Sequence, residues 1–207
     1  MSQLTEKKLK PNAVLDSGQV RQFVLPDGKT RITQITTFCP DVIGPGPTNL
    51  YLIDDDALIL LDTGIPTQLA KDFFYVWRNQ PMPPDVQKLR PDHSEQEFVE
   101  GLEIAGYSPR DIDLLVISHG HLDHFLMGDT IVNMGNPRVA AHVVDTPDIC
   151  NPWGLIHMWL SRHHILPATG MPGTANVRDR AMEYLGKKSV TESLHFSLQV
   201  DVPIIRD

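Results

Sequence analysis

The sequence predicts an α/β (layered α+β) fold, in which helices pack against a β-sheet. Three observations predict it. Several short segments have the alternating or continuous apolar pattern of strands, and residues 31–38 show it most clearly. Longer segments between them have apolar residues at helical spacing. In the middle of the chain these segments follow in the order strand, helix, strand, loop, helix, strand, which is typical of layered α/β proteins.

The first part of the chain is expected to be a weakly ordered lead, residues 1–28, that ends in a strand near residues 20–25. The segment Pro26-Asp27-Gly28 predicts a turn after that strand, since proline and glycine favour turns. The strand of residues 31–38 follows, with β-branched residues that alternate with polar ones. We therefore place the start of the main domain at residue 29.

A hairpin and a tight turn come next. Residues 49–53 and 57–61 predict two strands around the acidic turn Asp54-Asp55-Asp56. The second strand continues directly into Asp62-Thr63-Gly64, in which a carboxylate precedes a glycine that can adopt a tight turn. Asp62 is therefore expected at the end of a strand.

Two helices separate this hairpin from the next strand. Residues 67–79 have an apolar stripe at helical spacing, and a proline-rich connection over residues 81–91 ends that helix. A second helix is expected to run up to Gly106. Its start is predicted at Ser94-Glu95-Gln96-Glu97, which has the spacing of a capping box.

The second half of the chain begins with a short apolar strand over residues 113–118, of the kind buried on both faces. A helix over residues 125–134 and a strand over residues 138–144 follow. Helices are then predicted over residues 151–165 and 177–185, and a last strand over residues 198–205. The chain is thus divided into a lead (1–28), the main domain (29–145), and a helical insertion or cap with the start of a further β layer (146–207).

The composition limits the classes of function. The 207 residues carry a formal net charge of −8, so bulk electrostatics do not favour nucleic acid as a partner. No secretory signal or membrane-spanning apolar run is visible. The two cysteines, Cys39 and Cys150, have no metal-binding or redox spacing. We expect a cytoplasmic protein that acts on a small molecule, and a homodimer remains open.

The most informative segment is His119-Gly-His121-Leu-Asp123-His124, directly after the predicted strand of residues 113–118. Imidazole and carboxylate groups are ligands of zinc, manganese and iron. Side chains two residues apart on an extended chain point the same way, so His119 and His121 can meet one ion together. A turn aims Asp123 and His124 differently, which favours a second ion nearby. Polar residues that merely cap a helix are the alternative.

The pattern His-x-His-x-Asp-His resembles the signature of the metallo-beta-lactamase superfamily. Residues 49–53 and 60–64 resemble that superfamily's early strands and its aspartate turn, and the likeness extends over about residues 30–145. It implies a metallo-beta-lactamase-like αββα sandwich, of which this chain carries the N-terminal half. It also implies a hydrolase with two Zn²⁺ ions at the edge of the sheet, with Fe or Mn as alternatives.

The resemblance implies a role for each residue. His119 and His121 belong to the first metal, Asp123 and His124 to the second, and Asp62 supports the site from behind. The superfamily's later ligands, which commonly begin with a Gly-His turn, have no recognisable counterpart in this sequence. His142 and the histidines beyond residue 150 are expected to pack or to face solvent. We therefore expect the chain to be part of a longer protein, with weak metal binding and low activity by itself.

Three functions remain open from the sequence. The first is a metal-dependent hydrolase, in which Asp123 is the catalytic carboxylate that orients a metal-activated water toward a small ester, thioester or lactone. The second is a mononuclear iron sulfur-oxygenase of the same fold. The third is a non-catalytic module that keeps His119 to His124 as a structural metal clip. The content and number of bound metals would separate them.

Overall fold

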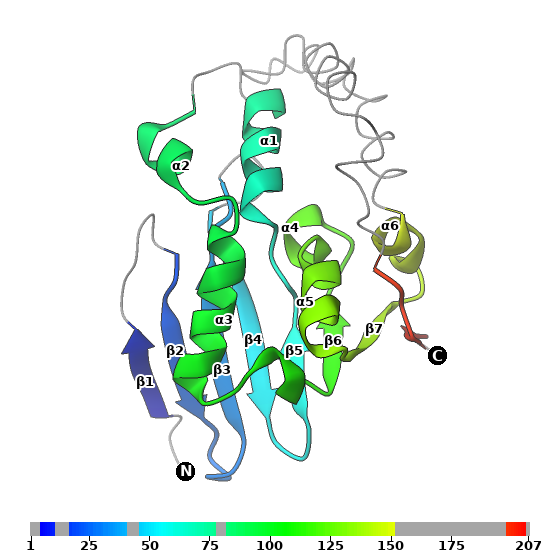
Figure 1. The fold of residues 1–207 in the computed structure, drawn as a ribbon. Helices are drawn as coiled ribbons and strands as arrows, with labels where there is room; N and C mark the ends of the chain where they lie inside the picture. The colour runs from blue at the N-terminus through cyan, green and yellow to red at the C-terminus, as the bar shows by residue number, and fades with distance from the viewer. Residues whose placement is uncertain (1–4, 11–16, 41–45, 78–81, 152–197, 206–207) are drawn as a thin grey trace, which may run out of the picture.

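A computed structural model of the chain describes residues 5–10, 17–40, 46–77, 82–151 and 198–205. Its described strands form one sheet in the order β1 to β8, so each strand lies beside its neighbours in the sequence (Figure 1). The strands are β1 (Thr5–Lys10), β2 (Val20–Val24), β3 (Arg31–Thr37), β4 (Thr48–Asp54), β5 (Leu58–Leu61), β6 (Leu114–Ile117), β7 (Arg138–His142) and β8 (Val202–Ile204).

The sheet is mixed. Strands β1 to β5 run antiparallel to their neighbours, and β4 and β5 form the predicted hairpin. Strands β5 to β8 are parallel. Parallel neighbours need a crossover connection, which helices commonly supply. The predicted α/β fold class is confirmed by this mixed sheet with helices.

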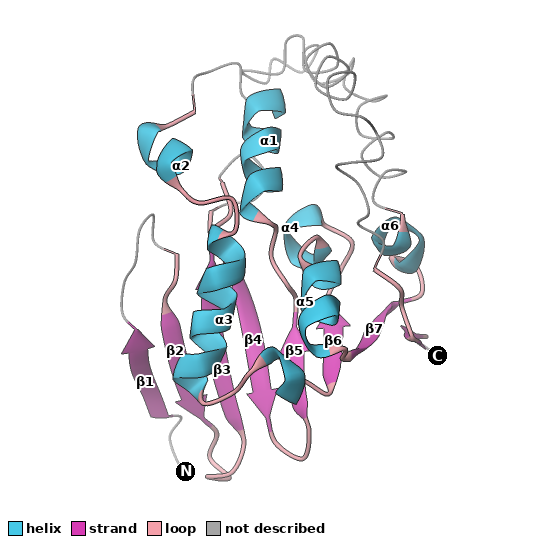
Figure 2. Ribbon diagram, in the orientation of Figure 1, coloured by secondary structure: helices cyan, strands magenta, loops and turns pink. Residues whose placement is uncertain are grey.

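Helices connect the parallel strands, and α3, α4 and α5 lie across one face of the sheet (Figure 2). The α-helices are α1 (Thr67–Trp77), α2 (Pro84–Lys88), α3 (His93–Ala105), α4 (Leu122–Phe125), α5 (Gly128–Gly135) and α6 (Thr146–Cys150), and a 3₁₀ turn, η2, covers Pro109–Asp111. The helix expected over residues 125–134 is confirmed as α5, which begins three residues later, and α4 is a short additional helix within the segment expected to be a loop. The predicted helices over residues 151–165 and 177–185 lie outside the described residues, apart from residue 151.

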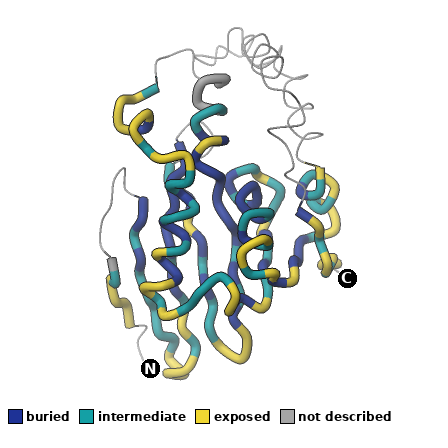
Figure 3. The backbone as a smooth tube through the Cα atoms, viewed as in Figure 1, coloured by how far each residue is buried: buried dark blue, intermediate teal, exposed yellow. Residues whose placement is uncertain are grey.

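The core lies between the sheet and these helices (Figure 3). Leu60 and Leu115 are paired across β5 and β6, and both are fully buried. Helix α3 packs closely on β3, because a Cβ added at Gly101 would lie 2.6 Å from Cγ2 of Ile35. Alternate residues of the strands face this core, which is the period of two expected for a sheet.

The capping box predicted at the start of α3 is wrong. The helix begins at His93, and the Ser94 hydroxyl donates to the carbonyl of Phe38 at 3.1 Å. Glu97 accepts the backbone N–H of Phe38 at 2.7 Å and also binds the hydroxyl of Ser17. These polar groups therefore attach α3 to the ends of β2 and β3 instead of capping the helix, because distant parts of the chain offer buried donors and acceptors that need partners.

The predicted lead contains more structure than its polar sequence indicates. A strand near residues 20–25 is confirmed as β2, and β1 extends the sheet by one further strand. The single sheet takes strands from all three predicted segments of the chain, and the boundaries at residues 29 and 146 stay predictions. Among the helices that the structure describes, none has the length and apolar character needed to cross a membrane.

Candidate functional site

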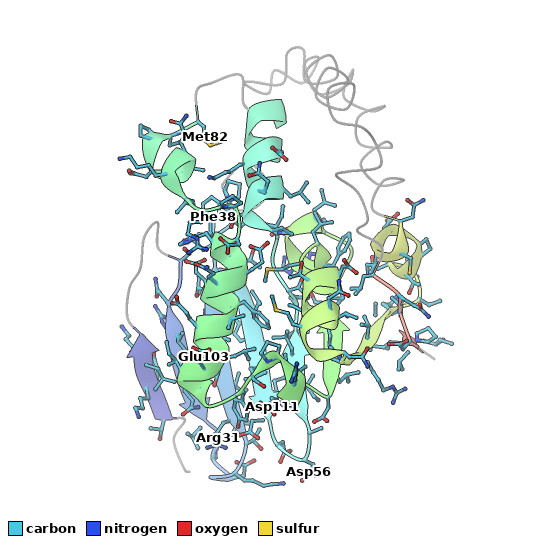
Figure 4. The ribbon with its side chains drawn as sticks, in the orientation of Figure 1. Arg31, Phe38, Asp56, Met82, Glu103 and Asp111 are labelled. Atoms are coloured by element: carbon cyan, nitrogen blue, oxygen red, sulfur yellow. The ribbon has the colours of Figure 1, made fainter. Side chains whose placement is uncertain are left out.

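The candidate site lies where β5 and β6 end. These strands are parallel neighbours, with Leu61 opposite Val116. Their carboxyl ends therefore meet at one edge of the sheet, the usual place for a site in such folds. Asp62 follows β5 and Ser118 follows β6. Figure 4 shows Arg31 and Asp56 at the opposite end of the sheet.

Asp62 joins the two strand ends. The residue is 5% exposed, and its backbone has a φ of 63°, a left-handed conformation that aspartate tolerates better than most residues. Oδ1 accepts the backbone N–H of Ser118 at 2.8 Å. Oδ2 accepts the Ser118 hydroxyl and Nδ1 of His124, each at 2.8 Å. One carboxylate thus holds both the end of β6 and an imidazole of the cluster.

The rest of the turn after β5 is attached to α4 and to the residue that precedes α5. The N–H of Thr63 donates to the carbonyl of His124 at 2.9 Å, and the carbonyl of Gly64 accepts the N–H of Met127 at 3.0 Å. Gly64 has a φ of 84°, and a Cβ there would lie 2.7 Å from Oγ1 of Thr37. Only glycine fits this position, so the predicted tight turn has a firm steric reason.

The three histidines of the motif gather beside this turn. His121 has an extended backbone and precedes the first turn of α4, which contains Asp123 and His124. The ring of His119 lies 4.5 Å from that of His121 and 4.1 Å from that of His124, measured between centroids. Nε2 of His124 lies 3.5 Å from Oδ2 of Asp123. The turn therefore places the four side chains of the motif in one cluster.

The cluster gives its imidazoles different proton affinities. The hydrogen bond that Nδ1 of His124 donates to Asp62 raises the pKa of His124, because the carboxylate stabilises the charged ring. Burial lowers the pKa of His119, and the neighbouring His124 lowers it further. His119 is therefore the imidazole more readily kept neutral, which is the form that binds a metal ion.

All five residues predicted from the sequence are brought together: His119, His121, Asp123, His124 and Asp62. Within the described part of the chain, no three of the donor side chains already face a common point. The imidazoles instead pack ring against ring, and turning them about their side-chain torsions would be needed to direct them at one ion. The donor set fits a metal centre by its chemistry, since imidazole nitrogens and a buried carboxylate oxygen lie side by side.

Two further residues lie against the cluster that the sequence did not single out. The Ser118 hydroxyl lies 2.9 Å from Nδ1 of His119 as well as contacting Asp62. Asp145, which precedes α6, lies beside the loop, since a Cβ added at Gly120 would be 3.3 Å from its Oδ1. A hydroxyl directly before the first histidine was the available signal for Ser118. Nothing in the local sequence indicates Asp145.

The other histidines remain outside this cluster or outside the described residues. His142 ends β7, and its Nδ1 accepts the backbone N–H of Val144 at 3.2 Å. The packing role expected for this residue stays a prediction. His157, His163, His164 and His195, together with the proposed cap residues Trp153, Met158 and Trp159, lie outside the described residues.

Comparison with known proteins gives one family. The family model described as the metallo-beta-lactamase superfamily matches residues 43–181. A search of curated proteins gives no match.

The solved structures with a likeness to the chain include the Rm3 metallo-beta-lactamase, with 17% identity, a TM-score of 0.37, and coverage of 59% of this chain and 32% of the other. A subclass B3 metallo-beta-lactamase of Bradyrhizobium japonicum has 19% identity, a TM-score of 0.38, and coverage of 57% and 33%. The FEZ-1 metallo-beta-lactamase from Legionella gormanii has 17% identity, a TM-score of 0.36, and coverage of 57% and 33%. The chain thus spans about a third of the length of these structures.

Proposed function

Because the chain belongs to the metallo-beta-lactamase superfamily, whose members are typically metal-dependent hydrolases, we propose that it carries the metal-binding motif of a zinc hydrolase for small esters, thioesters or lactones. The single observation that carries the proposal is the arrangement of His124. Its Nδ1 is held by Asp62 at 2.8 Å, and its Nε2 lies 3.5 Å from a carboxylate oxygen of Asp123.

The spacing of these donors suits a shared ion. Two ligands at about 2.1 Å from a tetrahedral zinc lie roughly 3.4 Å apart. The 3.5 Å between Nε2 of His124 and Oδ2 of Asp123 is close to that value. We assign these two residues to one Zn²⁺ and the neighbouring His119 and His121 to a second.

The chain's own residues have distinct parts in the proposed reaction. Bound zinc would act as a Lewis acid and make a water molecule acidic enough to serve as a nucleophile near neutral pH. Asp123 is a buried residue, and its carboxylate would accept a hydrogen bond from the attacking water and orient that water toward the substrate carbonyl. Asp62 fixes the imidazole of His124, as carboxylates behind metal-binding histidines do. The acidic net charge of −8 favours a small substrate over a nucleic acid.

The proposal is tested by zinc binding followed by turnover. Zinc is titrated into the purified chain by calorimetry, and a panel of esters, thioesters, lactones and phosphodiesters is then assayed with the metal present. We expect zinc binding that His121→Ala and Asp123→Asn each reduce by about 10-fold or more, and hydrolysis that Asp123→Asn abolishes.

A matched control is available on α5. Asp129→Asn removes the same charge as Asp123→Asn, and the Asp129 carboxylate contacts Asn133 in its own helix. This variant should bind zinc as the wild type does. One iron per chain, or zinc binding that the His121 and Asp123 variants leave unchanged, would overturn the proposal.

A further inference from the structure

We infer that Ser118 is a positioning residue that sets the tautomer of His119, so that Asp62 and Ser118 together direct Nε2 of two imidazoles away from the sheet and toward the cluster. This inference rests on the proposed function, because metal binding is what the tautomers would serve. The tautomers themselves follow from the hydrogen-bond geometry.

The argument starts from what each group can donate. The ionised carboxylate of Asp62 has no hydrogen to give, so every partner of its oxygens must be a donor. Nδ1 of His124, at 2.8 Å from Oδ2, therefore carries a hydrogen, and Nε2 is the nitrogen left free in the neutral ring. The Ser118 hydroxyl, also 2.8 Å from Oδ2, must direct its one hydrogen at the carboxylate.

That assignment determines which ring nitrogen of His119 carries the hydrogen. Since the Ser118 hydroxyl has already given its hydrogen to Asp62, it can only accept from Nδ1 of His119, which lies 2.9 Å away. Nδ1 of His119 is therefore protonated as well, and its Nε2 is free in the neutral ring. One carboxylate thereby determines the tautomers of two rings, directly for His124 and through a hydroxyl for His119.

The structure separates this role from a merely structural one. Ser118 also donates its backbone N–H to Oδ1 of Asp62 at 2.8 Å, and that bond survives any change of side chain. Ser118→Ala removes the hydroxyl while the strand end stays attached to Asp62. Ser118→Thr keeps the hydroxyl and is the matched control. Both changes fall on an exposed residue directly after β6.

The first measurement is the tautomer of each ring in zinc-free protein, read from long-range ¹H–¹⁵N NMR correlations at a pH where both rings are neutral, which for His124 lies above the ordinary imidazole range because Asp62 raises its pKa. We expect a hydrogen on Nδ1 of both His119 and His124 in the wild type. Ser118→Ala should shift His119 toward the Nε2–H form and leave His124 unchanged. Ser118→Thr should match the wild type.

The second measurement is zinc affinity by competition with a chromogenic chelator. We expect about 10-fold weaker binding for Ser118→Ala and a value within about 2-fold of wild type for Ser118→Thr, the usual range for groups that orient a metal-binding histidine. An Nε2–H tautomer at His119 in the wild type, or an unchanged His119 tautomer in Ser118→Ala, would overturn the inference. A wild type that binds no zinc would instead overturn the proposed function, while the tautomers still decide the role of Ser118.

Discussion

Replacing Asp62 by asparagine tests how the two strand ends and the histidine cluster depend on one carboxylate. Asparagine is the suitable change because it nearly preserves the shape of the side chain and tolerates the left-handed backbone at this position, where φ is 63°. Alanine would add a conformational cost at the same φ. The effect of Asp62→Asn therefore comes from the hydrogen bonds and the charge.

The magnitude follows from the partners of the side chain. Asp62 accepts three hydrogen bonds of 2.8 Å, from the N–H and hydroxyl of Ser118 and from Nδ1 of His124. Bonds to a charged acceptor contribute about 1.5–3 kcal/mol each, and bonds between neutral groups about 1 kcal/mol. Asparagine keeps one acceptor oxygen for the N–H of Ser118 and presents an NH₂ group to the other two partners, so bonds to a charged acceptor are replaced by neutral ones. Relief from burying a charge offsets part of the loss, which leaves a destabilisation of about 2 kcal/mol.

The same substitution should invert the tautomers. With its oxygen toward the N–H of Ser118, the asparagine presents an NH₂ group where Oδ2 stood. That group donates, so Nδ1 of His124 must accept and the ring hydrogen moves to Nε2. The Ser118 hydroxyl is released from Asp62 and can donate to His119 in the same way. Zinc affinity should then fall by about 100-fold, the upper end of the range for such supporting carboxylates.

Two assays check this prediction. Urea unfolding of the zinc-free chain, followed by circular dichroism, gives the change in the free energy of unfolding, and chelator competition gives the zinc affinity. Asp129→Asn is the control for the loss of one negative charge. A free energy of unfolding within about 0.5 kcal/mol of wild type, together with unchanged zinc affinity, would refute the reasoning that Asp62 joins the strand ends and orients His124.

Three further predictions follow from the contacts. Gly64→Ala should destabilise the chain by about 2–4 kcal/mol in urea unfolding, because φ is 84° and the new Cβ would lie 2.7 Å from Oγ1 of Thr37; a loss below about 0.5 kcal/mol would contradict this. Tyr107→Phe should cost about 1 kcal/mol at neutral pH, since its hydroxyl donates to Asp54 at 2.5 Å and is the main cause of the lowered pKa of that carboxyl. This difference should shrink as the pH falls through the lowered pKa of Asp54, and a pH-independent difference would count against it. Asp62 raises the pKa of His124, so in zinc-free protein the stability from that pair is full below about pH 6.5 and is lost as the pH rises through the raised pKa. The difference in the free energy of unfolding between wild type and Asp62→Asn should therefore be larger at about pH 6 than at about pH 9. An equal difference at the two pH values would show that the pair is not ionised in the folded state.

Features that depend on neighbouring residues could be predicted from the sequence. The hairpin of β4 and β5 follows from two apolar segments around an acidic turn, and both its strands and its antiparallel pairing are confirmed. The clustering of His119, His121, Asp123 and His124 follows from their spacing within six residues after a buried strand. In both cases the information lies within one short stretch of chain, so local rules are sufficient.

Features that depend on distant residues could not be predicted in this way. The Ser94 to Glu97 segment has the pattern of a capping box, and its side chains instead bind Phe38, which is more than 50 residues away. The polar strand β1 has no apolar pattern of its own and exists because β2 offers it an edge to pair with. In these cases tertiary partners override the local pattern, and a single sequence does not reveal which partners will meet.

The candidate site combines both kinds of information, and this division has a physical consequence. The ligand-type side chains come from one short segment, whereas the carboxylate that orients them comes from the end of a different strand. Asp62 precedes Ser118, one of its partners, by 56 residues. That carboxylate reaches the segment only when β5 and β6 are paired with Leu61 opposite Val116. A peptide of residues 113–127 would carry every proposed zinc ligand but would lack Asp62, so nothing would hold Nδ1 of His124 and Nε2 would not be the favoured donor. The pairing of β5 with β6 therefore converts a local sequence motif into an oriented set of donors, and metal binding should be lost together with that pairing when the chain unfolds.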